Sequence, residues 1–427
     1  MKLPVDIQQA RRTGNVVSDL AAIVLSIVAI IGLWDGRPWT TFVCALVLIV
    51  ALVSRGWARI ALSEVIYTPI PSARRLVQGD RFQLSMQVEN RKPLPLPWLQ
   101  LREIIPAGLS LSDAREGETL RTFNGGIEVA ETVGLGGYER ANLTIELIAT
   151  RRGHYTFGPT HLRSGDIFGF YRTNRSLRRH ETDLVVFPEL MELPILRFPA
   201  QRPIGDSAIR HPFIEDITRP SSVREFRSGD GARKVDWKTS AKRGELFVRT
   251  YDASVSHCVV MIVDCATHAD AYWRIDTGIL ESTITAAATI ATRCYKQKFH
   301  LGFVCNGTPM SGSTPPVMAP ASHKGRLLEI MNCLAAAGAI RTRSVENLIA
   351  RHGAKALPDG ATILYIGGTL QDGTLDFLKQ RRARGHPVQV LYTGRKDPPS
   401  LPRIDVVDLR PYCRELDPSV DDEADVA

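Results

Sequence analysis

The side chains with the greatest capacity for binding or chemistry are concentrated in one polar segment, EFRSGDGARKVDWKTSAKRGELFVRTYD, which spans residues 225–252. Across residues 201–250 the chain has eleven Lys or Arg and seven Asp or Glu. Such an excess of basic side chains attracts an acidic partner, a phosphate or lipid headgroups. We predict that residues 201–254 are a basic segment for partner binding or domain docking. Its candidate site residues are Arg227, Gly229, Asp230, Arg233, Asp236, Trp237, Ser240 and Lys242.

Two roles of this basic segment are compatible with its sequence. In the first, aspartates and arginines within the segment pair with one another and dock it onto the domain that follows. The residues available for this network are Asp230 and Asp236 with Arg224, Arg233 or Arg243. In the second, the same surface receives a partner. A large ring flanked by charged residues is more stable when it is covered, so we expect Trp237 to be at least half buried.

Other sets of reactive residue types are weaker. His257, His268 and His300 lie near cysteines in the sequence, and zinc or a Cys-His nucleophile would require them to meet in space. Cys258 and Cys305 lie in apolar runs, however, where a free cysteine normally acts as a small hydrophobic residue. Neither GxxxxGK[ST] nor GxGxxG occurs at a strand-to-helix junction, which disfavours an ATPase or a dinucleotide enzyme. We therefore predict no catalytic residues and no cofactor.

The overall composition is that of an ordinary globular protein. Of the 427 residues, 44% are hydrophobic and 23% are charged, which excludes a wholly disordered chain, a collagen-like repeat and a polytopic transporter. The net charge of +8 favours acidic partners or anionic lipid. No basic stripe interleaved with aromatic residues occurs, so we expect no nucleic-acid partner. The seven cysteines form no CxxC pair, which argues against a disulfide scaffold or a zinc ribbon.

Residues 1–60 are predicted to form a transmembrane hairpin. The apolar runs 16–34 and 38–54 are each long enough to cross a bilayer as a helix, and tryptophans lie near their ends, where such rings anchor at the interface. Basic residues flank the pair of runs, whereas the connecting turn has only Arg37, offset by Asp35. By the positive-inside rule, we expect both termini and the soluble domains to be cytoplasmic.

The part of the chain after the hairpin is expected to contain a β domain followed by an α/β domain. Alternating apolar and polar residues, without a helical period, predict an antiparallel β-sandwich over residues 61–200. Within it, prolines make Pro93–Trp98 an edge strand or a connection. Apolar strands alternate with helices over residues 255–411, which predicts a doubly wound, parallel α/β domain covered on both faces. Residues 412–427 are an acidic and disordered tail by composition.

Two motifs resemble the domain-of-unknown-function 58 family. One is the run 224–252, REFRSGDGARKVDWKTSAKRGELFVRTYD, and the other is RRGHYTFGPTHLRSGDIFGFYR, residues 151–172. The order of parts is similar too: a membrane hairpin, a β domain, the first motif, and an α/β domain similar to von Willebrand factor type A domains. The family is named for lacking a known activity, and its genes commonly lie beside those of MoxR-type AAA+ ATPases. The resemblance implies a membrane-bound partner of such an ATPase in the assembly or maturation of other proteins.

The resemblance also bears on metal binding at Asp264. A von Willebrand factor type A domain binds Mg²⁺ through a D-x-S-x-S loop after its first strand, with further oxygen ligands from later loops. In this chain Asp264 is present, but Ala266 and His268 occupy the two serine positions, and a later strand ends in Gly367-Gly368. We therefore predict a degenerate site without functional metal. We expect Asp264 to cap a helix or to accept loop amides, so that its replacement by alanine costs roughly 0.5 to 2 kcal/mol.

These observations lead to one main hypothesis and three alternatives. The main hypothesis is a non-enzymatic, membrane-anchored interaction or scaffold protein that partners a MoxR-type AAA+ ATPase. The alternatives are a divalent-cation-dependent ligand-binding module, an anionic-lipid-binding protein that uses the basic segment, and a hydrolase. The absence of a nucleophile motif argues against the last of these.

Overall fold

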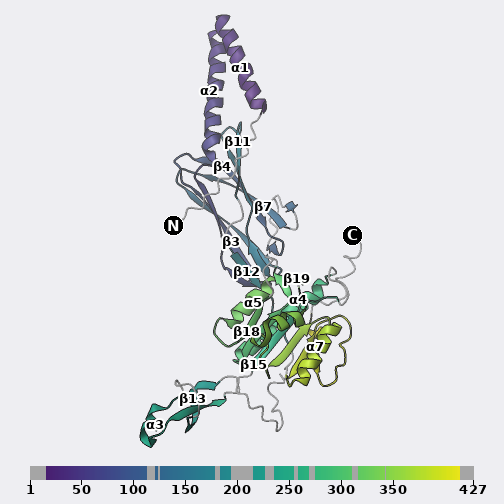
Figure 1. The fold of residues 1–427 in the computed structure, drawn as a ribbon. Coiled ribbons are helices and arrows are strands. Elements are labelled where there is room, and N and C mark those ends of the chain that lie inside the picture. The colour runs from purple at the N-terminus through teal and green to yellow at the C-terminus, as the bar shows by residue number, and fades with distance from the viewer. Residues whose placement is uncertain are drawn as a thin grey trace. The chain divides into compact units, whose positions relative to one another are not determined.

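The structure is a computed structural model that describes residues 16–112, 121–123, 126–177, 183–193, 215–226, 235–253, 258–268, 275–309, 316–341 and 343–413. Contacts between residues divide the chain into two compact units, Met1–Pro188 and Glu189–Ala427 (Figure 1). The acidic tail that the composition predicts lies almost entirely outside the described residues.

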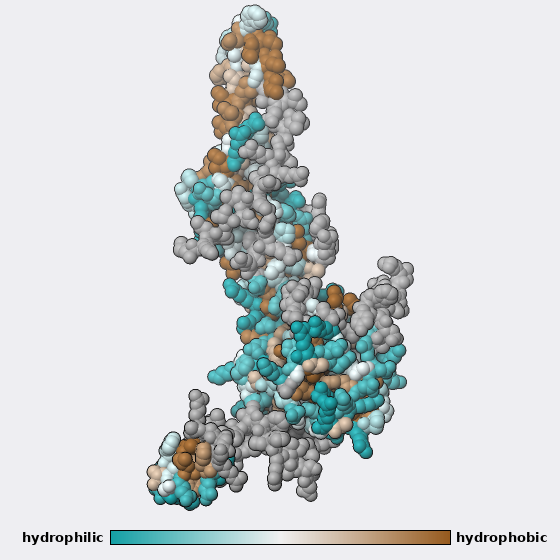
Figure 2. Space-filling view, in the orientation of Figure 1, coloured by the Kyte–Doolittle hydropathy of each residue, from teal (hydrophilic) through white to brown (hydrophobic). Residues whose placement is uncertain are grey.

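The first unit begins with two consecutive helices, α1 (Val16–Trp34) and α2 (Pro38–Ala61). Pro38 opens α2 at a position where its missing N–H costs nothing. α2 is long and apolar enough to cross a membrane, and it extends past the predicted end of the second run. Within α1, the apolar stretch with described side chains is the shorter Ile23–Trp34. Apolar residues cover the outer surface of these helices (Figure 2).

A β-sandwich follows the helices, as the sequence predicted. One sheet has the strand order β1-β3-β8-β5, and the other has the order β11-β10-β4-β7-β6. The strands of these two sheets are β1 (Val65–Pro71), β3 (Arg81–Asn90), β4 (Leu96–Ile105), β5 (Leu109–Leu111), β6 (Arg121–Phe123), β7 (Gly126–Leu135), β8 (Arg140–Ala149), β10 (Thr160–Gly165) and β11 (Arg172–Leu177). A small third sheet contains β2 (Arg75–Val77), β9 (Gly153–Thr156) and β12 (Asp183–Phe187). Alternate residues of the long strands fill a single core; in β3 these are Phe82, Leu84, Met86 and Val88.

The prediction for Pro93–Trp98 is wrong at its C-terminal end. Residues 96–98 begin β4, which lies between β10 and β7 rather than at an edge. The pairing of β4 with β7 shifts register between Leu96 and Leu99. A bulge of this kind accommodates Pro97, which cannot donate a ladder hydrogen bond.

The second unit begins with a two-stranded antiparallel sheet that contains part of the basic segment. Its strands are β13 (Glu215–Glu225) and β14 (Phe247–Ala253), and the short helix α3 (Trp237–Arg243) precedes β14. The sequence predicted a polar segment here without assigning it strands.

A six-stranded sheet forms the body of the second unit, in the order β18-β16-β15-β20-β21-β22. All neighbouring pairs are parallel except β16 with β18. The strands are β15 (Cys258–Asp264), β16 (His300–Cys305), β18 (Val317–Ala321), β20 (Thr362–Gly367), β21 (Val388–Tyr392) and β22 (Asp405–Asp408). Strands β17 (Gly307–Pro309) and β19 (Ala337–Arg341) pair separately.

Helices cover both faces of this sheet, as expected for near-continuous apolar strands. On one face α4 (Thr277–Lys296) and α5 (Arg326–Ala336) pack over one apolar core. On the other face α6 (Val345–His352) and α7 (Asp372–Ala383) pack over a second core. Short 3₁₀ turns, η3 (Gly353–Lys355) and η4 (Arg410–Tyr412), complete the unit. The doubly wound α/β architecture that the sequence predicted is therefore present, with one antiparallel edge strand added.

Candidate functional site

The topology of the α/β sheet places its natural binding crevice beside Asp264. The chain builds the sheet outward from β15 to β16 and β18, and then returns to add β20, β21 and β22 on the other side. In open α/β sheets, ligands bind outside the carboxyl ends of the strands where the strand order reverses, which here is between β15 and β20. Asp264 ends β15 and pairs in register with Gly367 of β20. This position is called the switch point below.

Neighbouring groups already satisfy the Asp264 carboxylate, which is 3% exposed. Its Oδ1 accepts hydrogen bonds from the backbone N–H of Ala266 at 2.9 Å and from Asn306 Nδ2 at 2.7 Å. Its Oδ2 accepts a hydrogen bond from the Tyr365 hydroxyl at 2.7 Å. A buried carboxylate requires such partners to offset its lost hydration. Asp264 is therefore part of a closed hydrogen-bond network that joins β15, β20 and the residue after β16.

The structure supports one of the two roles expected for Asp264 and corrects the other. The bond from the Ala266 amide confirms that Asp264 accepts a loop N–H. It is not a helix cap, because Asp276 caps α4 through the N–H of Ile279. Within the described residues, no group of three or more His, Cys, Asp or Glu side chains is placed to hold a metal ion.

A second polar pair lies at the start of α4. Arg395 Nε donates to Asp276 Oδ2 at 2.7 Å, and Thr267 Oγ1 accepts the backbone N–H of Asp276. Burial opposes ionisation of Asp276, but the hydrogen bonds from Arg395 and from the Ile279 amide outweigh it, so the pKa of this carboxyl lies below its usual range. The pair ties the loop after β21 to the N-terminus of α4, which is a structural role.

The cysteines of the first two strands do not form a reactive site. Cys265 and Cys305 Sγ atoms lie 3.7 Å apart, and both side chains are buried. Burial raises the pKa of the Cys258 thiol to about 11, which keeps it protonated and unreactive near neutral pH. His257 lies outside the described residues. These observations weigh against the Cys-His nucleophile considered from the sequence.

Half of the candidate residues in the basic segment belong to the part that the structure describes. Arg227, Gly229, Asp230 and Arg233 lie outside it. The remaining four, Asp236, Trp237, Ser240 and Lys242, are brought together at α3. They fall into two groups: Asp236 and Ser240, which make hydrogen bonds that fix α3, and Trp237 and Lys242, which are exposed.

Asp236 and Ser240 anchor α3. Asp236 is the N-cap, and its Oδ1 accepts the backbone N–H groups of Lys238 and Thr239. Ser240 Oγ donates to the carbonyl of Asp236 and accepts the N–H of Phe247 at 2.9 Å, which fastens α3 to β14. The helix ends at Gly244, whose φ of +73° suits a residue without a side chain.

Trp237 and Lys242 are exposed on α3. The side chain of Trp237 is 68% exposed, so the expectation that it is at least half buried is wrong. Trp237 is the first residue of α3, directly after the N-cap Asp236. Leu246, at 47% exposure, and Phe226, at 37%, add apolar surface near the ends of the same two-stranded sheet. We call the exposed side chains Phe226, Trp237, Lys242 and Leu246 the α3 surface.

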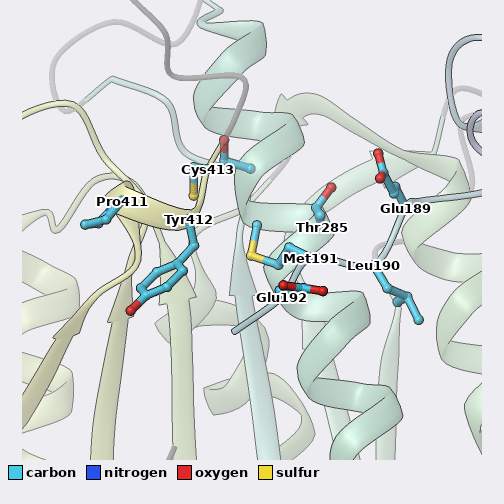
Figure 3. Close-up of a pocket in the computed structure, with 9 residues that line it drawn as sticks. Glu189, Leu190, Met191, Glu192, Thr285, Pro411, Tyr412 and Cys413 are labelled. Carbon is cyan, nitrogen blue, oxygen red and sulfur yellow. The ribbon is translucent and has the colours of Figure 1, made fainter. Parts of the chain in front are cut away.

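The second unit also has a pocket of about 460 Å³ that the sequence did not indicate (Figure 3). It is lined by the segment Glu189–Glu192, by two hydroxyl side chains of α4, and by residues at and just after η4. The α4 and η4 residues are Ser282, Thr285, Pro411, Tyr412 and Cys413. The backbone N–H of Met191 donates to Thr289 Oγ1, and Arg293 donates to the carbonyl of Leu193, so the segment is fixed on α4. The lining combines apolar groups with the carboxylates of Glu189 and Glu192 and the hydroxyls of Ser282 and Thr285.

Sequence reasoning missed the partners of Asp264. Asn306 had a usable signal, because it is a polar residue directly after an apolar strand and therefore lies at the carboxyl edge of the sheet. Tyr365 had none, because it lies in the middle of the apolar run ATILYIGG and has the pattern of a core residue. The pocket also had no signal in the sequence, because the segments that line it are separated by about 90 residues or more in the chain.

The fold and these sites define a class of protein. In chain order it has an apolar helical region, a β-sandwich, and a doubly wound α/β domain whose switch-point carboxylate is fully hydrogen-bonded. The model of the family described as "Protein of unknown function DUF58" matches residues 222–414, and this match assigns that part of the chain to the family. It confirms the family that the motifs indicated. The matched residues contain the α3 surface and the whole six-stranded sheet, but they exclude the second motif, residues 151–172.

A curated relative shows the same family likeness. The chain is 22% identical over 219 residues to "Uncharacterized protein YeaD" of Bacillus subtilis (strain 168). The alignment covers 51% of this chain and 49% of the relative, so the chain spans about half the length of the curated protein that it matches.

Solved structures match part of the chain at low sequence identity. A cohesin module from a Clostridium perfringens family 33 glycoside hydrolase is 10% identical, covers 30% of this chain and 97% of its own, and has a TM-score of 0.21. A non-cellulosomal cohesin from Archaeoglobus fulgidus is 16% identical, covers 29% and 90%, and has a TM-score of 0.20. At these scores the likenesses carry no argument about function.

Proposed function

We propose that this chain is a non-enzymatic, membrane-anchored interaction protein that presents the α3 surface to a protein partner. In this proposal the α/β domain is of the von Willebrand factor type A kind, and α1 and α2 both cross the bacterial cytoplasmic membrane. Arg55 and Arg59, exposed at the end of α2, favour a cytoplasmic side for everything that follows. The partner that the family resemblance implies is a MoxR-type AAA+ ATPase.

The exposure of Trp237 is the observation that carries the proposal. An indole that is 68% exposed leaves a large apolar area in water, and exposed aromatic clusters rimmed by polar groups mark interaction sites. Tryptophan and arginine are also the residues most often found at the energetic centre of protein interfaces. The capped and anchored α3 holds the ring in place before any partner arrives, so little ordering entropy opposes binding.

The switch point supports an interaction role over an enzymatic or cation-dependent one. An ion at Asp264 would have to displace the hydroxyl of Tyr365 or the amide of Asn306, both of which are buried donors. Ala266 offers no side-chain ligand and His268 offers nitrogen, whereas Mg²⁺ requires oxygen ligands in near-octahedral geometry. Calorimetry with Mg²⁺ on the full chain in detergent distinguishes the cation-dependent alternative, because that alternative requires heat of binding that Asp264→Ala abolishes.

Co-purification tests the interaction. Full-length protein in detergent is incubated with the purified AAA+ ATPase of the same cell, with ATP, with ADP and without nucleotide. We expect the ATPase to be retained and its retention to depend on nucleotide. Trp237→Ala lowers retention by at least about 30-fold, the factor equivalent to a 2 kcal/mol hot spot. Ile340→Ala is the matched control, because Ile340 is also 68% exposed and lies in the same unit.

Two results would overturn parts of this proposal. If wild-type protein fails to retain the ATPase in every nucleotide state, the partnership is rejected. If Trp237→Ala and Ile340→Ala bind the ATPase equally well, the α3 surface is not the docking site.

A further inference from the structure

The loop between β10 and β11 has an exposed apolar tip that the proposed function does not use. Ile167 is 60% exposed, Phe168 62% and Phe170 50%, in a protein whose other large β-sandwich side chains are mostly buried. The rings of Phe168 and Phe170 stack with their centroids 5.8 Å apart. This tip, Ile167–Phe170, belongs to the second family motif, residues 151–172.

The loop holds this conformation through Asp166, which is 1% exposed. The Asp166 carboxylate accepts three backbone N–H groups, those of Phe168 at 3.1 Å, Phe170 at 3.3 Å and Tyr171 at 2.7 Å. The carbonyl of Asp166 accepts the indole N–H of Trp98. Gly169 has a φ of +74°, which lets the chain reverse between the two phenylalanines. The apolar side chains are therefore held outward by a rigid frame rather than exposed by disorder.

Contacts within the first unit place this loop at the end of the sandwich from which α2 departs. Arg175 of β11 donates to the carbonyls of Leu62 and Val65, just after α2. Tyr67 lies farther along β1, and its hydroxyl donates a hydrogen bond to Glu103. Glu103 pairs in register with Thr160, which lies at the end of β10 opposite to the loop. The end of β10 that leads into the loop is therefore the end nearer α2. Both β10 and β11 contact α2 (Figure 1).

The level of the loop along α2 follows from standard element geometry. Arg172, where β11 begins, lies about 10 Å beyond Arg175 at the usual rise of a strand. A helix rises 1.5 Å per residue, so the residue of α2 that lies about 10 Å before Leu62 is roughly Arg55. Arg55 is the first charged residue after the apolar run of α2, which is where the hydrocarbon of a bilayer would give way to headgroups. The apolar tip is thus level with the expected membrane surface.

Other side chains at this end of the sandwich suit the same environment. Tyr138, 72% exposed, lies in the turn between β7 and β8, and its backbone N–H donates to the Lys92 carbonyl. Lys92 in turn donates to Ser63, just after α2. Aromatic side chains with one polar end are typical of the membrane interface. Exposed Arg59 and Arg172 add positive charge that attracts anionic headgroups.

We propose that the β10–β11 loop is a membrane-interface anchor, in which Ile167, Phe168 and Phe170 insert among the lipid headgroups beside α2. The loop fixes the tilt of the β-sandwich against the bilayer, so that the soluble units do not pivot freely on the helices. This inference rests on one part of the proposed function, the crossing of the membrane by α2, and it is independent of the ATPase partner.

Photo-crosslinking to lipid tests the anchor in the full chain. Phe168 is replaced by p-benzoylphenylalanine, which keeps the aromatic ring, and the protein is reconstituted in vesicles of phosphatidylethanolamine and phosphatidylglycerol. Parallel samples have the same probe at Leu46 of α2, which is 51% exposed, and at Ile70 of β1, which is 46% exposed. Ile70 lies about 17 Å along β1 from Val65, away from α2. After illumination, mass spectrometry measures the fraction of protein that carries one phospholipid.

We expect lipid adducts at Phe168 and Leu46, and at least about tenfold less adduct at Ile70, a ratio equivalent to ~1.4 kcal/mol. With the probe at Ile167, the double change Phe168→Ser and Phe170→Ser lowers the adduct while the adduct at Leu46 is unchanged. Adducts at Leu46 without adducts at Phe168 overturn the anchor and leave the membrane crossing intact. Absence of adducts at Leu46 overturns both. Protein-to-protein adducts at Phe168 in place of lipid show that a second chain covers the loop, which also overturns the anchor.

Discussion

Replacing Asp264 with alanine removes the acceptor at the centre of the switch-point network. Tyr365 can still donate to the carbonyl of Thr369 at 3.1 Å, so its hydroxyl retains a partner. The backbone N–H of Ala266 and the side-chain amide of Asn306 lose the acceptor that each has in the wild type. Leaving a buried donor unsatisfied costs about 1 to 3 kcal/mol, so the two donors together lead us to expect a loss of roughly 2 to 6 kcal/mol in local stability. This exceeds the cost of a lost helix cap, which was the expectation from the sequence.

Hydrogen exchange is the appropriate assay, because a chain with two units does not unfold in a single two-state step. Peptides that cover β15 and β20 report the opening free energy of the sheet itself. A loss of roughly 2 kcal/mol accelerates their exchange by about 30-fold, and larger losses accelerate it further. Peptides from the β-sandwich, in the other unit, serve as the internal reference and should exchange at the wild-type rate.

Two control variants separate the network from general damage. Asp376→Ala removes an exposed carboxylate of α7 that lies 3.9 Å from Lys379, and it should change exchange in β15 by less than threefold, equivalent to ~0.6 kcal/mol. Asp264→Asn keeps the shape and one carbonyl acceptor, so its effect should lie between those of the two alanine variants. The reasoning is refuted if Asp264→Ala matches Asp376→Ala. It is also refuted if Mg²⁺ slows exchange of the wild-type sheet and EDTA reverses that change, because a bound cation would then stabilise the site.

Two further predictions concern buried polar groups away from the switch point. Burial raises the pKa of Glu103 in the β-sandwich to about 6, despite hydrogen bonds from Thr160 and Tyr67, so the folded state holds its proton more tightly than the unfolded chain does. The stability of the sandwich should therefore rise by up to roughly 2 kcal/mol as the pH falls from above 6 to about 4.5. Hydrogen exchange of β4 peptides measures this pH dependence, and Glu103→Gln should flatten it. An unchanged pH dependence in the variant would exclude Glu103 as the source of the effect. Ser240→Ala should leave the N–H of Phe247 without its acceptor and accelerate hydrogen exchange in β14 by a factor equivalent to about 1 to 3 kcal/mol. The exposed control Lys238→Ala should leave the exchange rate of β14 unchanged. Equal rates in the two variants would contradict the role assigned to Ser240.

The sequence predicted the α/β elements well because their signal is local. Within the range predicted to alternate strands and helices, the apolar run CVVMIVD forms β15 and residues 345–352 form α6. Each of these segments has enough apolar residues at one spacing to define its own type. The pairing of strands is not local, and this is where prediction failed. Nothing in the residues 317–321 indicates that β18 would pair antiparallel at the edge of a parallel sheet.

The site was less predictable than the fold because hydrogen-bond partners are chosen by the tertiary arrangement. Asp264 could be located by its position at a strand end, but its partner Tyr365 is about 100 residues away and has the sequence context of a core side chain. Trp237 illustrates the converse failure. A ring between Asp236 and Lys238 satisfies the same local pattern whether a domain covers it or solvent surrounds it. Burial is a property of what packs above the residue, and the sequence near the residue does not encode that.

The contrast between Asp264 and the two exposed aromatic sites bears on which surfaces of the chain are available for binding. At the switch point, every oxygen of the carboxylate is engaged by a neighbour from the same domain, so a ligand there must compete with existing buried bonds at a cost of about 1 to 3 kcal/mol for each one broken. At Trp237 and at Phe168, the apolar surface is already held outward by short hydrogen-bonded frames, and covering it releases water without breaking an internal bond. Binding at these surfaces is therefore favoured over binding at the sheet edge. Because one frame follows α2 and the other belongs to the α/β unit, the proposed membrane anchor and the proposed protein-binding surface use different residues.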